Sequence, residues 1–189
     1  MKKIILVLVC LLLICTMGAC SEDILEGVDK VFNRLYSNDE EVARATLDEL
    51  VKVLEAEDAE ALKALFASNV VKDNENFDES IEALFEYYNG EFKSCSSDGS
   101  VEASCSMEYG ETTESEYYSS YDVATSDDKY RIAIYEVTVD KGDSDNVGIV
   151  SLYIIRKEDD TSLGLVYRGD DKYTPGININ IKNSLPDIH

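Results

Sequence analysis

The chain has 189 residues, of which 17 are Lys or Arg and 39 are Asp or Glu, so its formal net charge is −22 at pH 7. A protein of that charge repels nucleic-acid phosphates and anionic lipid headgroups, which excludes nucleic-acid binding. The same acidity would attract cations or basic peptides, but the simpler interpretation, which we favour at this point, is solubility.

The first twenty residues have the pattern of an export signal. Two lysines precede an apolar stretch, Ile4–Cys15, which is shorter than the ~20 residues that a membrane-spanning helix needs. Gly18 and Ala19 then lead to Cys20. This pattern resembles a bacterial lipobox, in which the cysteine is acylated and becomes the first residue. We therefore predict a lipoprotein signal peptide at residues 1–19, lipidation of Cys20 and an extracytoplasmic location, anchored to the cell membrane by lipid; plain secretion with cleavage nearby is the alternative.

Helical spacing of apolar residues dominates the first half of the remaining chain. Residues 20–37 form a lipid-anchored segment that contains either a short amphipathic helix or a disordered tether. A single domain follows over residues 38–181, and residues 182–189 form a flexible tail. The domain begins with three predicted helices, Asn38–Ala56, Asp58–Ala67 and Phe77–Tyr88, joined in part by a polar connection at Asn69–Asn76.

From Glu91 onward the apolar residues alternate, which is typical of β-strands. The predicted strands are Glu91–Cys95, Val101–Tyr109, Tyr117–Val123, Tyr130–Val139, Val147–Arg156, Leu163–Arg168 and a last edge strand at Ile177–Ile181. In the two strongest strands both faces carry large apolar residues, so we expect the second face of the sheet to be covered. The cover is the Ile177–Ile181 segment, a helix at Ile24–Leu35, or a second subunit in a homodimer.

Five cysteines occur, and two of them precede the predicted cleavage site. Besides Cys20, the exported chain keeps Cys95 and Cys105, on strands that we expect to be neighbours. An even pair in an exported chain predicts a disulfide between them, with two free thiols as the alternative. A catalytic cysteine is discounted because the only histidine is His189.

The order of helices followed by antiparallel strands predicts an α+β fold. Within it, the segment EAEDAEALKALFASNV, Glu55–Val70, resembles the first-to-second-helix junction of the nuclear-transport-factor-2-like superfamily, also called cystatin-like or SnoaL-like. With the lipobox, and with motifs at Gly148–Leu152 and Tyr173–Ile177, the chain resembles an uncharacterised family of Firmicutes lipoproteins that carries a domain of unknown function. The resemblance implies a cone in which about three N-terminal helices pack on one face of a curved antiparallel sheet around a pocket. It implies no activity and no catalytic residue.

Pocket enzymes of the resembled superfamily use a carboxylate, often with a tyrosine as hydrogen-bond donor. The residues that we predict for a pocket or binding surface are Tyr121, Tyr135, Glu136, Tyr153 and Tyr167. A carboxylate in an apolar site has a raised pKa and can serve as a base, so an isomerase-, dehydratase- or cyclase-like enzyme is one alternative. The absence of an internal histidine favours instead a non-catalytic domain that binds a protein or small ligand, with a structural envelope protein as a third interpretation.

We predict no metal site and no cofactor. The loop Asp140–Asn146 carries Asp143 and Asp145 at alternate positions, as calcium loops do. The calcium motif would also need oxygen ligands at Val147 and Ile154, and both residues are apolar. Aspartate, glycine and asparagine are in any case the residues that hairpin turns prefer.

Overall fold

The computed structural model describes residues 39–99, 101–161 and 165–183. The predicted signal peptide, Cys20, the segment 20–37 and residues 184–189 lie outside this range. The chain divides into two units, Met1–Glu41 and Val42–His189, and every strand belongs to the second.

None of the helices in the described ranges is long and apolar enough to cross a membrane.

The helices occupy the N-terminal part of the fold. A long helix spans residues 39–56 and is followed by α2 (Ala59–Leu65), α3 (Ser68–Asp73) and α4 (Phe77–Tyr87). Asp58 caps α2 by accepting a hydrogen bond of 2.9 Å from the backbone N–H of Ala61. The three predicted helices are confirmed. The predicted polar connection at Asn69–Asn76 is wrong in its first half, because Val70 is buried in the core and holds α3 against it.

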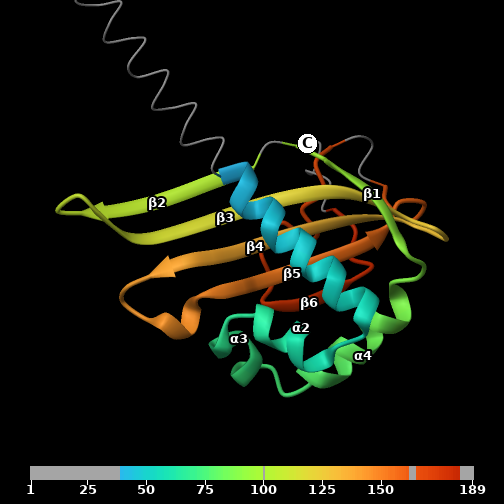
Figure 1. Cartoon of the computed structure of the whole chain (residues 1–189), viewed down its shortest axis with the longest axis horizontal. Helices are drawn as coiled ribbons and strands as arrows, with labels where there is room; N and C mark the ends of the chain where they lie inside the picture. The colour runs from blue at the N-terminus through green and yellow to red at the C-terminus, as the bar shows by residue number, and fades with distance from the viewer. Residues whose placement is uncertain (1–38, 100, 162–164, 184–189) are drawn as a thin grey trace, which may run out of the picture. The chain divides into compact units, whose positions relative to one another are not determined.

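Six strands form one sheet: β1 (Phe92–Ser97), β2 (Glu102–Glu108), β3 (Glu111–Thr125), β4 (Lys129–Asp140), β5 (Gly148–Arg156) and β6 (Gly176–Ile179). A 3-10 turn, η1 (Ser144–Asn146), lies between β4 and β5. The strand order is β1-β3-β4-β5-β6, with β2 also paired to β3, and only β5 and β6 run parallel. The molecule is therefore an α+β protein with a mostly antiparallel open sheet (Figure 1).

Two strand predictions need correction. Tyr117–Val123 is only the second half of β3, which is 15 residues long and pairs with β4 along most of its length. Of the predicted strand Leu163–Arg168, the described residues 165–168 form no strand. They belong instead to a connection that crosses the sheet before β6.

The predicted disulfide between Cys95 and Cys105 is also wrong, and both thiols are free. Strands β1 and β2 do not form a hairpin; they pair with different parts of the same edge of β3. Cys95 lies opposite Val123, whereas Cys105 lies opposite Ser115. Eight residues of extended strand span about 26 Å, whereas the Cα atoms of a disulfide are less than about 7 Å apart.

One face of the sheet, here called the helix face, packs against the helices. In Figure 1 the long helix, coloured blue to cyan, crosses this face. Apolar side chains from β3, β4 and β5 meet apolar side chains from the helices in a single core cluster. Its large members with no exposed surface are Leu47, Leu50, Leu62, Leu84, Tyr130, Ile132 and Ile134. Burial of this area supplies the main driving force for folding.

The opposite face, here called the far face, carries a second cluster of buried residues. Its members are Tyr118, Ala133, Tyr153, Ile155 and Tyr167, with Tyr135 and Tyr173 packed against them. The expectation that the second face is covered is therefore confirmed. The cover is the connection over residues 165–175. Residues 177–179 of the predicted Ile177–Ile181 segment instead belong to β6, and Ile177 and Ile179 pack against the helix-face core.

Candidate ligand-binding groove

The junction of α2 and α3 approaches β5 closely enough for a backbone hydrogen bond. Ala67 N donates to Ile149 O at 3.0 Å, and Phe66 forms a parallel bridge with Ile149. The neighbouring Gly148 has φ +131°, and a Cβ atom at that position would lie 2.6 Å from Ala67 N. Glycine at this position therefore allows the contact that brings α3 to the end of the sheet.

A chain of side-chain hydrogen bonds then fixes α3 to the connection between β4 and β5. Asn69 Nδ2 donates to Asn146 Oδ1, and Asn146 Nδ2 donates to Asp140 Oδ2 at 2.7 Å. Lys72 forms an ion pair of 2.7 Å with Asp145 on the solvent side. The hydrogen bond from Asn146 lowers the pKa of Asp140 below its ordinary value, so this carboxylate is negatively charged at neutral pH.

A cavity of about 590 Å³ lies at this end of the molecule. It is bounded by α3 and the turn after it, by the ends of β3 and β4, and by the residues just before β6. Apolar side chains of Val70, Val137, Val150 and Pro175 line it together with Tyr135. Its polar lining is Asn69, Asp73, Asn74, Glu75, Glu114, Glu116, Asp140 and Asn146. Five carboxylates and no lysine or arginine line this acidic groove, which concentrates negative potential in a concave site.

The carboxylates of the acidic groove are spread along it. Among the described residues no group of three or more His, Cys, Asp or Glu side chains is placed to hold a metal ion. Asn69 Oδ1 is buried in the groove wall and accepts no hydrogen bond from the described residues. The arrangement therefore suits a ligand with several positive charges and N–H donors better than a single chelated ion.

A smaller cavity of about 300 Å³ adjoins the acidic groove on the far face and shares Glu116 and Tyr135 with it. Besides Tyr117, three tyrosines from three different segments line it: Tyr118 on β3, Tyr135 on β4 and Tyr173 in the connection before β6. We call these three residues the tyrosine cup. Tyr118 and Tyr135 are directly opposite each other in the β3–β4 register.

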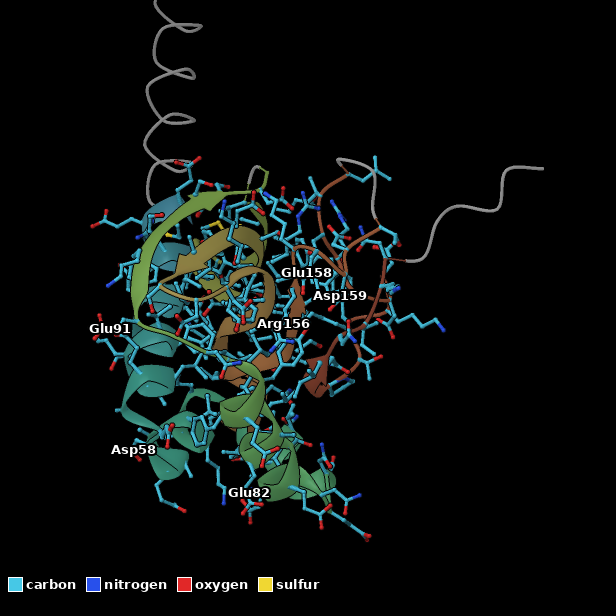
Figure 2. All side chains as sticks on the ribbon, turned by 90° about the vertical axis from the view of Figure 1, so that its right-hand side faces the viewer. Asp58, Glu82, Glu91, Arg156, Glu158 and Asp159 are labelled. Atoms are coloured by element: carbon cyan, nitrogen blue, oxygen red, sulfur yellow. The ribbon has the colours of Figure 1, made fainter. Side chains whose placement is uncertain are left out.

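Basic residues gather at the opposite end of the strands. A cavity of about 520 Å³ there is lined by Lys129, Arg156 and Lys157, together with acidic residues such as Glu158. Figure 2 labels Arg156, Glu158 and Asp159 at this end, where Asp159 N donates to Arg156 O in a turn. The two ends of the sheet thus differ in charge, and the acidic groove carries the purely negative lining.

The structure separates the five predicted site residues into two groups. Tyr135, Tyr153 and Tyr167 belong to the far face, and only Tyr135 lines the acidic groove. The hydroxyl of Tyr153 donates to Asp170 at 2.6 Å, and that of Tyr167 donates to Ile181 O at 2.5 Å, so both hold the covering connection. Tyr121 and Glu136 contribute to the helix face, on the other side of the sheet.

Glu136 is a buried carboxylate with a specific partner. Its side chain is 5% exposed, and Oε2 accepts a hydrogen bond of 2.7 Å from Thr46 on the long helix. Burial raises the pKa of Glu136 from its ordinary value of 4.5 to about 7, and the bond from Thr46 opposes this increase. Such a pKa suits a general base, but the group lies between helix and sheet, on the face opposite the groove.

The sequence comparison gives one family. The family described as Domain of unknown function (DUF5104) matches residues 49–157, which is more than half of the chain. The matched region contains α2 to α4 and β1 to β5, and hence most of the acidic groove. No curated protein matches the sequence.

Proposed function

The chain belongs to this family, whose description names no activity, and from that premise we propose that it is a cell-surface lipoprotein with a non-catalytic binding domain. Its ligand is cationic and binds in the acidic groove. The observation that carries the proposal is the lining of that groove, which combines five carboxylates with several apolar side chains and contains no basic residue.

The volume and chemistry of the groove support this proposal. A cavity of about 590 Å³ lies within the range of natural ligand sites. The apolar floor of Val70, Val137, Val150 and Pro175 suits the methylene groups of a lysine-like chain, while the carboxylates suit its ammonium groups. The overall charge of −22 steers cations toward the protein and increases their rate of association at low salt. The ligand class is therefore an oligocation with aliphatic spacers, as in a lysine-rich peptide.

Calorimetric titration with oligolysine tests the proposal. We expect binding that weakens as salt rises, and no binding of an oligoglutamate of equal length. The variant Asp73→Asn/Glu75→Gln/Glu114→Gln removes three groove charges and should weaken oligolysine binding at least tenfold, or about 1.4 kcal/mol.

The matched control is Glu79→Gln/Glu82→Gln/Glu86→Gln, which removes three exposed charges from α4. Because this variant has the same net charge as the groove variant, it separates a specific site from general attraction. Equal loss of affinity in the two variants would show that oligolysine binds to the diffuse charge of the protein, and the proposed site would be rejected.

The rival interpretation is an enzyme with a carboxylate base. Glu136 has the raised pKa that such a base needs, but it lies on the helix face, whereas the groove opens beside α3 and the far face. The proposal therefore predicts that Glu136→Gln leaves oligolysine affinity within about twofold of the unaltered protein, since Glu136 does not line the groove and carries only part of a charge at neutral pH. A loss comparable to that of the groove variant would favour the rival.

The lipid anchor is a separate part of the proposal and rests on the lipobox pattern that ends at Cys20. Cys20→Ala should abolish fatty-acid labelling and release the protein from the membrane fraction. Cys10→Ala, within the predicted signal, is the matched control and should leave both unchanged. Membrane retention of the Cys20 variant would contradict lipid anchoring.

A further inference from the structure

The ring of Tyr173 packs against the other two rings of the tyrosine cup, and all three border a cavity. Tyr173 lies edge-on to Tyr118, with ring centroids 5.5 Å apart and an interplanar angle of 63°. The same ring is tilted by 37° against Tyr135 at 5.0 Å. A cavity of about 300 Å³ remains beside them, and Glu102 and Glu116 line its rim. Aromatic faces combined with nearby carboxylates provide an electrostatically negative site for a cation.

An arginine side chain of the protein itself already lies against one ring of the cup. The guanidinium of Arg168 lies over Tyr118, with its central carbon 5.0 Å from the ring centroid, and also forms an ion pair with Glu102. The folded chain therefore contains one contact between an organic cation and a cup tyrosine.

The hydroxyl groups of Tyr118 and Tyr135 and the carboxylate of Glu102 already have hydrogen-bond partners. The hydroxyl of Tyr118 donates to Tyr167 O at 2.5 Å, and Glu102 accepts a hydrogen bond from Arg168. The hydroxyl of Tyr135 is bonded to Glu116, and this bond and burial raise the pKa of Tyr135 to about 12. Ring faces provide no conventional acceptor for the three N–H donors of a primary ammonium, so only the rim carboxylates Glu102 and Glu116 could pair with them. A trimethylammonium group brings charge and apolar surface but no donor.

We propose that the tyrosine cup binds the head of a small quaternary ammonium compound, with the choline head as the chemical type. This site goes beyond the oligocation proposed for the acidic groove, and it has its own ring geometry and its own ligand. The positive charge faces the rings and the two carboxylates, while the methyl groups contact the ring faces.

Titration with choline and with its neutral carbon isostere, 3,3-dimethyl-1-butanol, tests the proposal on the full chain. The two molecules have nearly the same shape and differ in charge. We expect choline and tetramethylammonium to bind, with at least a tenfold preference over the neutral alcohol, because a desolvated cation–π contact contributes on that scale. Equal binding of choline and the alcohol would show an unselective apolar cavity, and absence of choline binding would reject the site outright.

Variants of Tyr135 distinguish the contribution of its ring to choline binding from that of its hydroxyl. Tyr135→Phe keeps the aromatic face and should retain choline affinity within about threefold, whereas Tyr135→Leu should lose about tenfold. Arg168→Ala removes a competing positive charge from the cup and should increase choline affinity. If Tyr135→Phe bound choline as weakly as Tyr135→Leu, a cation–π site would be contradicted. Thermal melting of each variant shows whether it is folded.

The two proposed sites can be tested independently of each other. The groove variant Asp73→Asn/Glu75→Gln/Glu114→Gln leaves the three cup tyrosines and both rim carboxylates intact and should keep its preference for choline over the neutral alcohol. Tyr173→Leu removes a ring that lines the cup but not the acidic groove, so it should weaken choline binding and leave oligolysine binding unchanged. Loss of choline preference in the groove variant would assign choline to the groove and reject the cup.

Discussion

Thr46 on the long helix donates a hydrogen bond of 2.7 Å to Glu136 on β4, and this pair joins helix and sheet within the helix face. The second oxygen, Oε1, is buried and accepts no hydrogen bond from the described residues. A charged carboxylate in this position is poorly compensated, which is why burial raises the pKa of Glu136 to about 7. The interface is consequently sensitive to pH.

The Glu136 pair predicts that stability decreases as pH rises. The pKa of Glu136 is 4.5 ordinarily and about 7 in the folded protein, so the folded state binds the proton more tightly. The stabilisation is complete below pH 4.5 and is lost as pH rises through about 7. Glu136→Gln has no such proton, so it should be more stable than the unaltered protein by about 2–3 kcal/mol at about pH 8, and nearly equal at about pH 4.5.

Urea denaturation at several pH values measures this difference. The control is Glu82→Gln, which changes an exposed carboxylate on α4 and should leave the pH dependence as it is. A Glu136→Gln variant whose advantage is the same at both pH values would contradict the raised pKa.

Arg131 on β4 is the centre of a buried charge cluster on the far face. Its side chain is 9% exposed and lies 3.2 Å from Asp98, 3.3 Å from Asp122 and 2.7 Å from Asp160. It also donates to Leu165 O at 2.9 Å, so it links the break between β1 and β2 to the covering connection. Three carboxylates thus share one guanidinium, and Asp122 also pairs with Lys157.

We therefore predict that Arg131→Ala costs about 3–5 kcal/mol of folding free energy, because it leaves buried carboxylates without their partner. Arg44→Ala is the matched control: it breaks an exposed pair with Asp48 on one helix turn and should cost less than about 1 kcal/mol. Both values come from urea midpoints. Similar losses in the two variants would show that the Arg131 cluster is not buried as described.

The free thiols predict a definite order of alkylation. Cys105 is exposed on β2, whereas Cys95 is partly buried on β1, and burial raises the pKa of the Cys95 thiol. Iodoacetamide should label Cys105 first, without prior reduction of the protein, and Cys95 more slowly. Peptide mass spectrometry gives both rates. A bridged peptide that contains Cys95 and Cys105 would contradict the strand register.

Local patterns in the sequence predicted much of the fold. Helical periodicity located the long helix, α2 and α4. Alternation located β4 and β5, and their apolar residues on both faces predicted the covered far face. The finer resemblance to the nuclear-transport-factor-2-like superfamily stays a prediction.

The elements that the sequence did not predict correctly have one physical cause in common: their conformation depends on tertiary contacts. The first half of β3 reads ETTESE, and its strand conformation depends on β2 and β4 on either side. The covering connection has no periodicity and includes Asp171 and Tyr173 at positive φ. The acidic groove combines Asp73, Glu114 and Asp140 from distant segments, so only the high density of acidic residues could have indicated it.

Gly148 connects the stability of the fold to the groove, and Gly148→Ala is the last prediction. A Cβ atom there would lie 2.6 Å from Ala67 N and 2.8 Å from the carbonyl carbon of Phe66, both of them backbone atoms, at φ +131°. The α2–α3 junction must move away, which weakens the bond from Ala67 N to Ile149 O. We expect the free energy of unfolding to fall by at least about 2 kcal/mol and oligolysine to bind more weakly, because α3 supplies one wall of the groove.

The control is Gly110→Ala, where φ is +85° but no atom lies within 4 Å of the added carbon. It should cost about 1 kcal/mol from backbone strain alone and leave oligolysine affinity unchanged. Urea midpoints and calorimetry give both values, and unchanged oligolysine affinity in folded Gly148→Ala would show that the position of α3 does not shape the site.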